Sequence, residues 1–171
     1  MKKEFYLGFL LLSIGINCYS QVDYSLKAEI GYLKFWYRGL EVDPAPNWKG
    51  YNLDKNENGI DLNVVNGINY NNKLYAGLGI GYLNFEGIDG LSIFSDFEYL
   101  PLKTRLSPLI NLKIGYSHIW NQYENGKGTA LGELGLGFNY RLNKSFGIYV
   151  KSGFLLTQQS LFLPVRLGVK F

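Results

Sequence analysis

His118 is the one histidine in this chain of 171 residues, and it is the natural candidate for a general base. A hydrolytic centre would also need a nucleophile within hydrogen-bond reach of the imidazole. Ser117 is adjacent in sequence, but neighbouring side chains of an extended chain point to opposite faces. The position two residues after His118, which shares its face, holds Trp120. The residues therefore favour an imidazole packed beside an indole over a catalytic pair.

A second candidate is the stretch Asp54-Lys-Asn-Glu-Asn-Gly59-Ile-Asp61, which resembles the start of a calcium-binding loop. Alternating oxygen ligands suit calcium, and a glycine permits the sharp turn that such loops make. The twelfth position should supply a bidentate glutamate, but it holds Val65. We therefore expect an Asn-rich turn that leads into a strand, and we assign no metal and no cofactor.

The segment Pro44-Ala-Pro46-Asn-Trp48 lies in the longest connection, 39–58. An exposed tryptophan flanked by prolines could contact lipopolysaccharide, a glycan or a protein, which makes 39–58 a candidate extracellular binding loop. The same tryptophan could equally fold onto its own domain. The sequence leaves both interpretations open.

The amino-terminal end has the composition of an export signal. Lys2 and Lys3 precede an apolar run over 5–16, and small or polar residues follow before Gln21. This pattern predicts a cleaved signal peptide over 1–20 and a single domain over 21–171. The run is too short for a membrane-spanning helix, which needs about 20 apolar residues. Cleavage would remove Cys18, the only cysteine, so disulfides and thiol chemistry are not expected.

The rest of the chain alternates between apolar and small or polar residues with a period of two, which is typical of strands. The alternation and the intervening turn residues predict eight strands, over 24–37, 60–70, 73–85, 91–100, 109–120, 130–142, 146–156 and 161–171. Asn71-Asn72 and Asn143-Lys144 have the composition of tight turns.

One face of every predicted strand is bulky and apolar, whereas the other carries glycines and charges. An eight-stranded barrel has an interior just wide enough to be filled by side chains, so the bulky face must point outward. Only Lys34 and His118 interrupt it. A charge at the bilayer midplane costs such a barrel about 2–4 kcal/mol, so this nearly uncharged exterior indicates contact with lipid.

The inward face then collects charges of both signs. Buried charges are tolerable only when they are paired and hydrogen-bonded, which predicts a salt-bridge network across the lumen. The alternative is a charge-lined pore, which eight strands leave little room for. The inward residues are Lys27, Lys113, Arg141, Lys151, Arg166 and Lys170 with Glu29, Asp61, Asp96, Glu98 and Glu133.

An even number of strands places both termini on one side, which we expect to be the periplasmic side because the turns there are short. The connection 101–108 would lie on that side, and 39–58, 86–90, 121–128 and 157–160 would face outward. Aromatic residues near strand ends predict the two interfacial belts. They are Tyr70, Tyr99, Tyr140, Phe146 and Phe171 on the periplasmic side, and Trp36, Tyr82, Trp120 and Phe154 on the outer side.

The predicted mature chain resembles the small eight-stranded outer-membrane barrels, the group that contains OmpX, OmpW and the membrane domain of OmpA. The resemblance rests on the strand set, on the segment Pro108-Leu-Ile-Asn-Leu-Lys-Ile-Gly-Tyr116 and on the carboxy-terminal Phe171. It implies an all-β, antiparallel, up-and-down transmembrane barrel in the outer membrane of a Gram-negative bacterium. It also implies that the assembly machinery of that membrane reads the final strand. It implies almost nothing about activity, because fold alone does not define function.

We therefore expect a non-enzymatic, monomeric barrel with a polar, salt-bridged lumen that acts in membrane integrity or in surface contact through its loops. Its expected partners are outer-membrane lipids and lipopolysaccharide, with a possible extracellular ligand at 39–58. A net charge of +3 gives no reason to expect nucleic acid. A narrow, porin-like channel is the first alternative. Lipid A modification is the second, although barrels with that activity place a serine two residues after the histidine, where this chain has Trp120.

Overall fold

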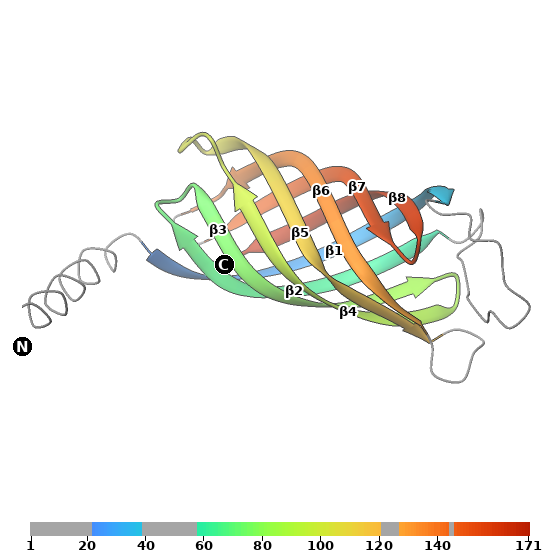
Figure 1. Cartoon of the computed structure of the whole chain (residues 1–171). Helices are drawn as coiled ribbons and strands as arrows, with labels where there is room; N and C mark the ends of the chain where they lie inside the picture. Colours follow the sequence, from blue (N-terminus) through green and yellow to red (C-terminus); the bar gives the residue numbers. More distant parts are fainter. Residues whose placement is uncertain (1–21, 39–57, 121–126, 144–145) are drawn as a thin grey trace, which may run out of the picture.

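The computed structural model describes residues 22–38, 58–120, 127–143 and 146–171, and these form a closed barrel of eight strands (Figure 1). Each strand pairs antiparallel with its neighbours in chain order, and β8 closes the barrel against β1. The described residues include no helix that is long and apolar enough to cross a membrane. The strands are β1 (Val22–Arg38), β2 (Gly59–Tyr70), β3 (Leu74–Phe85), β4 (Ile88–Tyr99), β5 (Leu106–Trp120), β6 (Lys127–Arg141), β7 (Gly147–Thr157) and β8 (Ser160–Lys170).

The beginning of β1 and the end of β8 lie together at one end of the barrel, which we call the terminal rim. The backbone amide of Leu26 donates to the carbonyl oxygen of Phe171 at 3.1 Å, and the amide of Phe171 donates back at 2.8 Å. The opposite end is the distal rim. This common side for the first and last strands confirms the even, up-and-down arrangement that the alternation predicted.

Two connections at the distal rim are shorter than the sequence suggested. The predicted loops over 86–90 and 157–160 are tight turns around Glu86-Gly87 and Gln158-Gln159. Both central residues of each turn have positive φ, from 50° at Gln158 to 100° at Gly87. Such turns match the right-handed twist of the strands they join, so the strands continue almost to the turn.

Three strands also begin earlier than the sequence predicted. β4 begins at Ile88 rather than at residue 91, β5 at Leu106 rather than at 109, and β6 at Lys127 rather than at 130. Pro108 lies inside β5 opposite Phe138, although it was predicted to end the connection 101–108. A proline removes one amide donor from the ladder, but hydrogen bonds on either side of it hold the strand in place.

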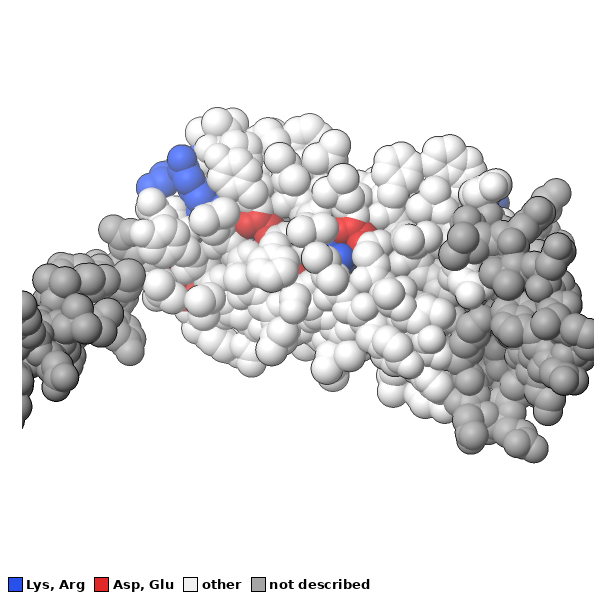
Figure 2. Space-filling model, in the orientation of Figure 1, with Lys and Arg blue, Asp and Glu red and all other residues white. Residues whose placement is uncertain are grey.

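The outer wall of the barrel is largely apolar, as the alternation predicted. Leu136 and Val150, for example, are 64% and 42% exposed. Figure 2 shows one side of this wall, where uncharged residues cover most of the described surface. A group of Lys or Arg atoms lies at one end, and small patches of acidic and basic atoms are visible between the uncharged residues in the middle. The two predicted belts hold ring pairs, Trp36 stacked on Phe154 at 5.5 Å and Phe146 against Phe171 at 5.2 Å between centroids.

Candidate functional site in the barrel lumen

Among the described residues, the lumen holds five cationic and five acidic side chains in ion pairs, contributed by seven of the eight strands. All except Lys170 are at most 4% exposed. Because a buried charge is tolerable only when it is paired, the equal numbers of the two signs make this interior feasible. The ten residues are Lys27, Lys113, Lys151, Arg166 and Lys170 with Glu29, Asp61, Asp96, Glu98 and Glu133.

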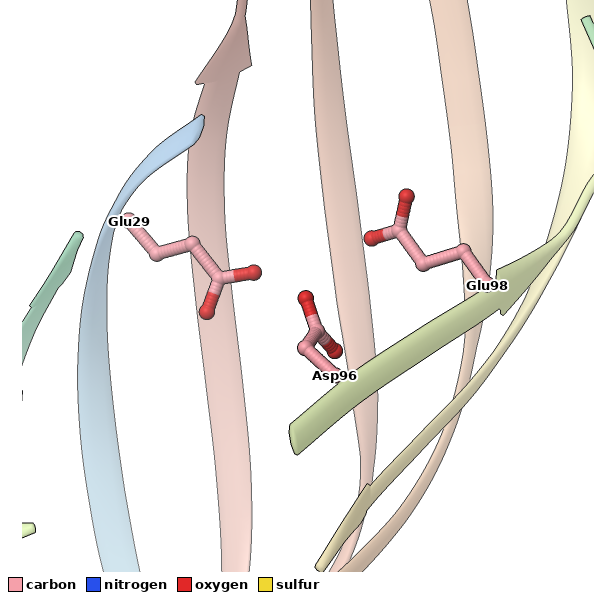
Figure 3. Close-up of side chains that lie close together, drawn as sticks. All are labelled: Glu29, Asp96 and Glu98. Carbon is pink, nitrogen blue, oxygen red and sulfur yellow. The ribbon is translucent and has the colours of Figure 1, made fainter. Parts of the chain in front are cut away.

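Lys27 lies at the centre of three carboxylates. Its ammonium contacts Asp96 and Glu98, and it lies 3.8 Å from Glu29 Oε1. Figure 3 shows these three carboxylates converging from β1 and β4. One oxygen from each lies within 4.8 Å of the others, as in a cation site. The Lys27 ammonium lies among these oxygens, and Lys113, Lys151 and Lys170 pair with the same carboxylates, so protein cations face all three acidic groups.

Glu29 connects this cluster to the opposite wall. Lys151 Nζ contacts Glu29 Oε1 at 2.7 Å, and the Tyr149 hydroxyl donates to the same oxygen at 2.7 Å. Lys113 binds the other carboxylate oxygen. Asn111 accepts from Lys151 at 2.9 Å and donates to Asp96, which links the two groups of charges. The result is one continuous network across the bore.

Arg166 organises a second cluster between β2, β6 and β8. Its guanidinium donates to both carboxylate oxygens of Glu133, at 3.0 Å from Nε and 2.6 Å from Nη2, and its Nη1 contacts Asp61. Gly31 is required beside this cluster, because a Cβ there would overlap the Asp61 carboxylate and Arg166 Nη1. The inward glycines thus provide the space that the charged side chains fill.

The distal half of the lumen is apolar, which corrects the expectation of a polar lumen throughout. Phe85 and Phe162 are fully buried with ring centroids 5.3 Å apart, and Phe35 meets Phe162 edge-on at 5.7 Å. The alternation of faces along the strands places these residues on the inward face, so the sequence carries a signal for an apolar cluster beside the one for charges and glycines. The members near the distal rim are Leu33, Phe35, Leu83, Phe85, Ile119, Leu131, Leu155 and Phe162. Val65 and Phe94 continue the cluster to the middle of the bore, and Tyr75 lies near the terminal rim beside Lys27 and Lys170.

Side chains near the β7–β8 turn complete the distal end. Ser117 Oγ lies 2.6 Å from Thr157 Oγ1, and the Gln158 amide nitrogen donates to Ser117 Oγ at 3.0 Å. Ser117 is therefore buried in the lumen, whereas His118 lies on the outer face with its ring 5.1 Å from Trp120. The structure does not bring the histidine and the serine together.

The terminal half opens into a vestibule, a cavity of about 670 Å³ lined in part by Ser25, Asn139, Arg141 and Lys170. Arg141 was expected in the lumen network, but it is half-buried at this cavity and forms no ion pair with any described residue. The hydroxyl of Ser25 is buried without a hydrogen-bond partner among the described residues. The alternation of apolar and polar residues along the chain gave no indication of this cavity.

The remaining candidates lie mainly outside the described residues. They are the signal peptide over 1–20, the segment Pro44–Trp48 and the first half, 54–57, of the calcium-like stretch. Its last member, Asp61, is described and is bound to Arg166 inside the barrel. That carboxylate therefore belongs to the lumen network.

Comparison with solved structures identifies the same fold in known membrane barrels. Neisserial surface protein A superposes with a TM-score of 0.60 over 87% of this chain and 97% of its own, at 10% sequence identity. The N-terminal β-barrel domain of Pseudomonas aeruginosa OprF gives a TM-score of 0.53 over 88% of this chain and all of its own, at 12% identity. No protein-family model and no curated protein matches the sequence.

The closed eight-stranded topology and the apolar outer wall define the class of the protein. It is a small transmembrane β-barrel of the outer-membrane type, and its place is the outer membrane. The resemblance to small outer-membrane barrels drawn from the sequence is thereby confirmed at the level of the fold.

Proposed function

We propose that this protein is a non-enzymatic, non-conducting membrane anchor that holds its distal connections at the cell surface, where they act in membrane integrity or surface contact. The observation that carries the proposal is the filled bore. A charge network occupies its middle and an apolar cluster occupies its distal half. Eight strands leave an interior that side chains can fill, so neither water nor ions have a continuous path.

The same observation supports a structural role for the ion pairs. Removing one member of a buried pair leaves an uncompensated charge in a poorly solvated interior, so these residues are coupled to the integrity of the whole barrel. Their arrangement offers no open coordination position and no solvent-exposed nucleophile. A scaffold that presents loops is the role that such an interior suits best.

Single-channel recording in planar bilayers tests the proposal. We expect the purified protein to give no steady conductance steps in 1 M potassium chloride, because the middle and the distal half of the bore are filled by side chains. Steady steps of uniform size from the unmodified protein would contradict the sealed lumen. A preparation of a known porin, inserted under the same conditions, controls for bilayer quality.

A narrow channel is the second candidate, and the vestibule at the terminal rim is the observation in its favour. This polar cavity already opens part of the bore from the terminal rim. Beyond the charge network, the apolar cluster is the main barrier to ions on the distal side. The double variant Phe85→Ala/Phe162→Ala removes two rings from that barrier. Conductance in the unmodified protein would favour the channel, whereas conductance that appears only in the double variant would favour the anchor.

The remaining parts of the proposal concern export and partners. Residues 1–20 would direct export, and the final strand ending at Phe171 would be read by the outer-membrane assembly machinery. The terminal rim would then face the periplasm, with 39–58 available to an extracellular ligand on the other side. The protein would act as a monomer in contact with outer-membrane lipids and lipopolysaccharide.

A further inference from the structure

The outer wall carries a hollow of about 730 Å³ that spans six neighbouring strands in the order β5, β6, β7, β8, β1 and β2. Ala28 and Val169, both half-buried, form most of its floor with Gly168, and the inward-facing Glu29 and Tyr149 also border the hollow. Larger side chains rise at its two ends, with Phe138 and Tyr140 on β6 and Leu62 on β2. The wall is therefore grooved at this place rather than evenly convex.

Strand register shows how the groove runs. Leu106, Tyr140, Ile148, Val169 and Ala28 are successive partners across β5, β6, β7, β8 and β1. The row starts at the terminal rim, because Leu106 is the first residue of β5 and Tyr140 is one residue from the end of β6. It reaches β1 at Ala28, six residues into that strand. The groove thus climbs obliquely from the rim toward the middle of the wall.

The dimensions of the groove suit a single hydrocarbon chain. Five strand-to-strand spacings of about 4.8 Å give a length of about 24 Å. On strands tilted by about 45°, that length spans about 17 Å of depth, close to half of a hydrocarbon core about 30 Å thick. An acyl chain that starts at the terminal rim would therefore lie in the groove through one leaflet.

An arginine borders the rim end of the groove, and a tyrosine lines it. Arg105 directly precedes Leu106, which lines the groove, and its backbone carbonyl accepts from the amide of Arg141 at 2.7 Å, so Arg105 lies at the rim just outside the groove. Its side chain is exposed and forms no ion pair with any described residue. Tyr140 is 40% exposed beside it, at the level of the terminal belt, where a phenol can bond to a polar head. Lys103 is nearby but is directed elsewhere, since its ammonium donates to Asn71 at 2.7 Å. A guanidinium favours phosphate, which it binds through two parallel hydrogen bonds.

We propose that this groove is a binding site for one anionic glycerophospholipid of the leaflet at the terminal rim. One acyl chain lies along the groove over Ala28, and the phosphate lies beside Arg105. The proposed site requires that the outer wall faces lipid, but it does not require a sealed lumen. The test of this site can therefore fail or succeed independently of the test of the proposed function.

Native mass spectrometry of the full barrel provides the test. The protein is inserted into nanodiscs of dioleoylphosphatidylcholine with one tenth dioleoylphosphatidylglycerol, released into mild detergent, and its retained lipids are counted. We expect one retained phosphatidylglycerol molecule. Ala28→Phe fills the floor of the groove and should lower this retention at least fivefold. Ala76→Phe is the matched control, because Ala76 is an exposed alanine on β3, away from the groove.

The headgroup is tested separately. Arg105→Gln should abolish the preference for phosphatidylglycerol over phosphatidylcholine, whereas Lys103→Gln should preserve it. Val169→Phe fills the same groove from β8 and replaces Ala28→Phe if that variant fails to show heat-modifiable migration in gels. Equal lipid loss in Ala28→Phe and Ala76→Phe, an unchanged preference in Arg105→Gln, or a dimer in place of the lipid adduct would overturn the proposal.

Discussion

Arg166 is the side chain on which two buried carboxylates depend, since it binds both Glu133 and Asp61. Arg166→Met preserves most of the side-chain volume but leaves these carboxylates without a cation. We expect the free energy of unfolding to fall by about 3–5 kcal/mol, the usual result of removing one partner from a buried pair. Urea titration of the barrel in phospholipid vesicles, followed by tryptophan fluorescence, measures the change.

Arg141→Met is the matched control for that prediction. Arg141 is also an inward arginine, but it is half-buried and forms no ion pair with any described residue. Its replacement should change the free energy of unfolding by less than about 1 kcal/mol, in the range of exposed charges. Equal losses in the two variants would show that the ion pairs of Arg166 contribute nothing specific.

His118 supports a prediction about activity. Its ring lies against Trp120 on the outer face, and Ser117 is bound to Thr157 and Gln158 inside the barrel. Expression of His118→Ala should therefore leave the same lipid A acyl pattern as expression of the unmodified protein. Mass spectrometry of extracted lipid A provides the measurement, and an acyl group lost only with the unmodified protein would restore the enzyme hypothesis.

The alternation of side chains along the strands predicted which charged residues face inward, but not which of them form ion pairs. Lys27, for example, was placed in the lumen by its position in the alternation, yet its contacts with Asp96 and Glu98 join β1 to β4 across the bore. Such pairs depend on the stagger of all eight strands, which a single sequence does not specify. Arg141 shows the same limit. It faces inward as predicted, but it forms no ion pair with any described residue.

At the scale of the strand, the period-two pattern predicted all eight strands, and the errors lie at their ends. The sequence predicts strand breaks at Gly90 and Pro108, but both residues lie within paired strands, opposite Ile119 and Phe138. Antiparallel pairing continues across one unfavourable residue when both neighbours of the strand are in register. The tight turns at Glu86-Gly87 and Gln158-Gln159 extend the strands further than residue composition suggested.

Close approach between β6 and β7 gives a prediction at the same scale. A Cβ at Gly137 would overlap the Val150 carbonyl oxygen and would lie 2.7 Å from Lys151 Cα, whereas a Cβ at Gly132 on the same strand would meet nothing within 4 Å. Gly137→Ala should lower the free energy of unfolding by about 1–3 kcal/mol, because backbone must shift to relieve the overlap.

Gly132→Ala should leave the stability of the barrel nearly unchanged in the same urea titration. The two substitutions add the same methyl group to the same strand, so any difference reports the local spacing of β6 and β7. A larger loss at Gly132 than at Gly137 would be incompatible with the described register.

For the whole molecule, the lumen divides into an ionic middle and an apolar distal half, and only the first was expected from the sequence. Leu33 and Phe85 share the inward face with the charges but lie nearer the distal rim. Recognising this gradient requires the position of each residue along the barrel axis. Side-chain alternation shows whether a residue faces the lumen or the lipid. Its position along the barrel axis depends on how all eight strands assemble.

Spin labels at single cysteines on the outer wall test the central claim, that hydrocarbon surrounds the bulky face. Leu136→Cys and Val150→Cys place labels on β6 and β7 at exposed positions, and Asn72→Cys in the exposed β2–β3 turn provides an aqueous reference. In vesicles, relaxation of the two wall labels should respond strongly to oxygen and weakly to a water-soluble nickel chelate. Wall labels that respond to nickel as strongly as the label at position 72 would contradict the account.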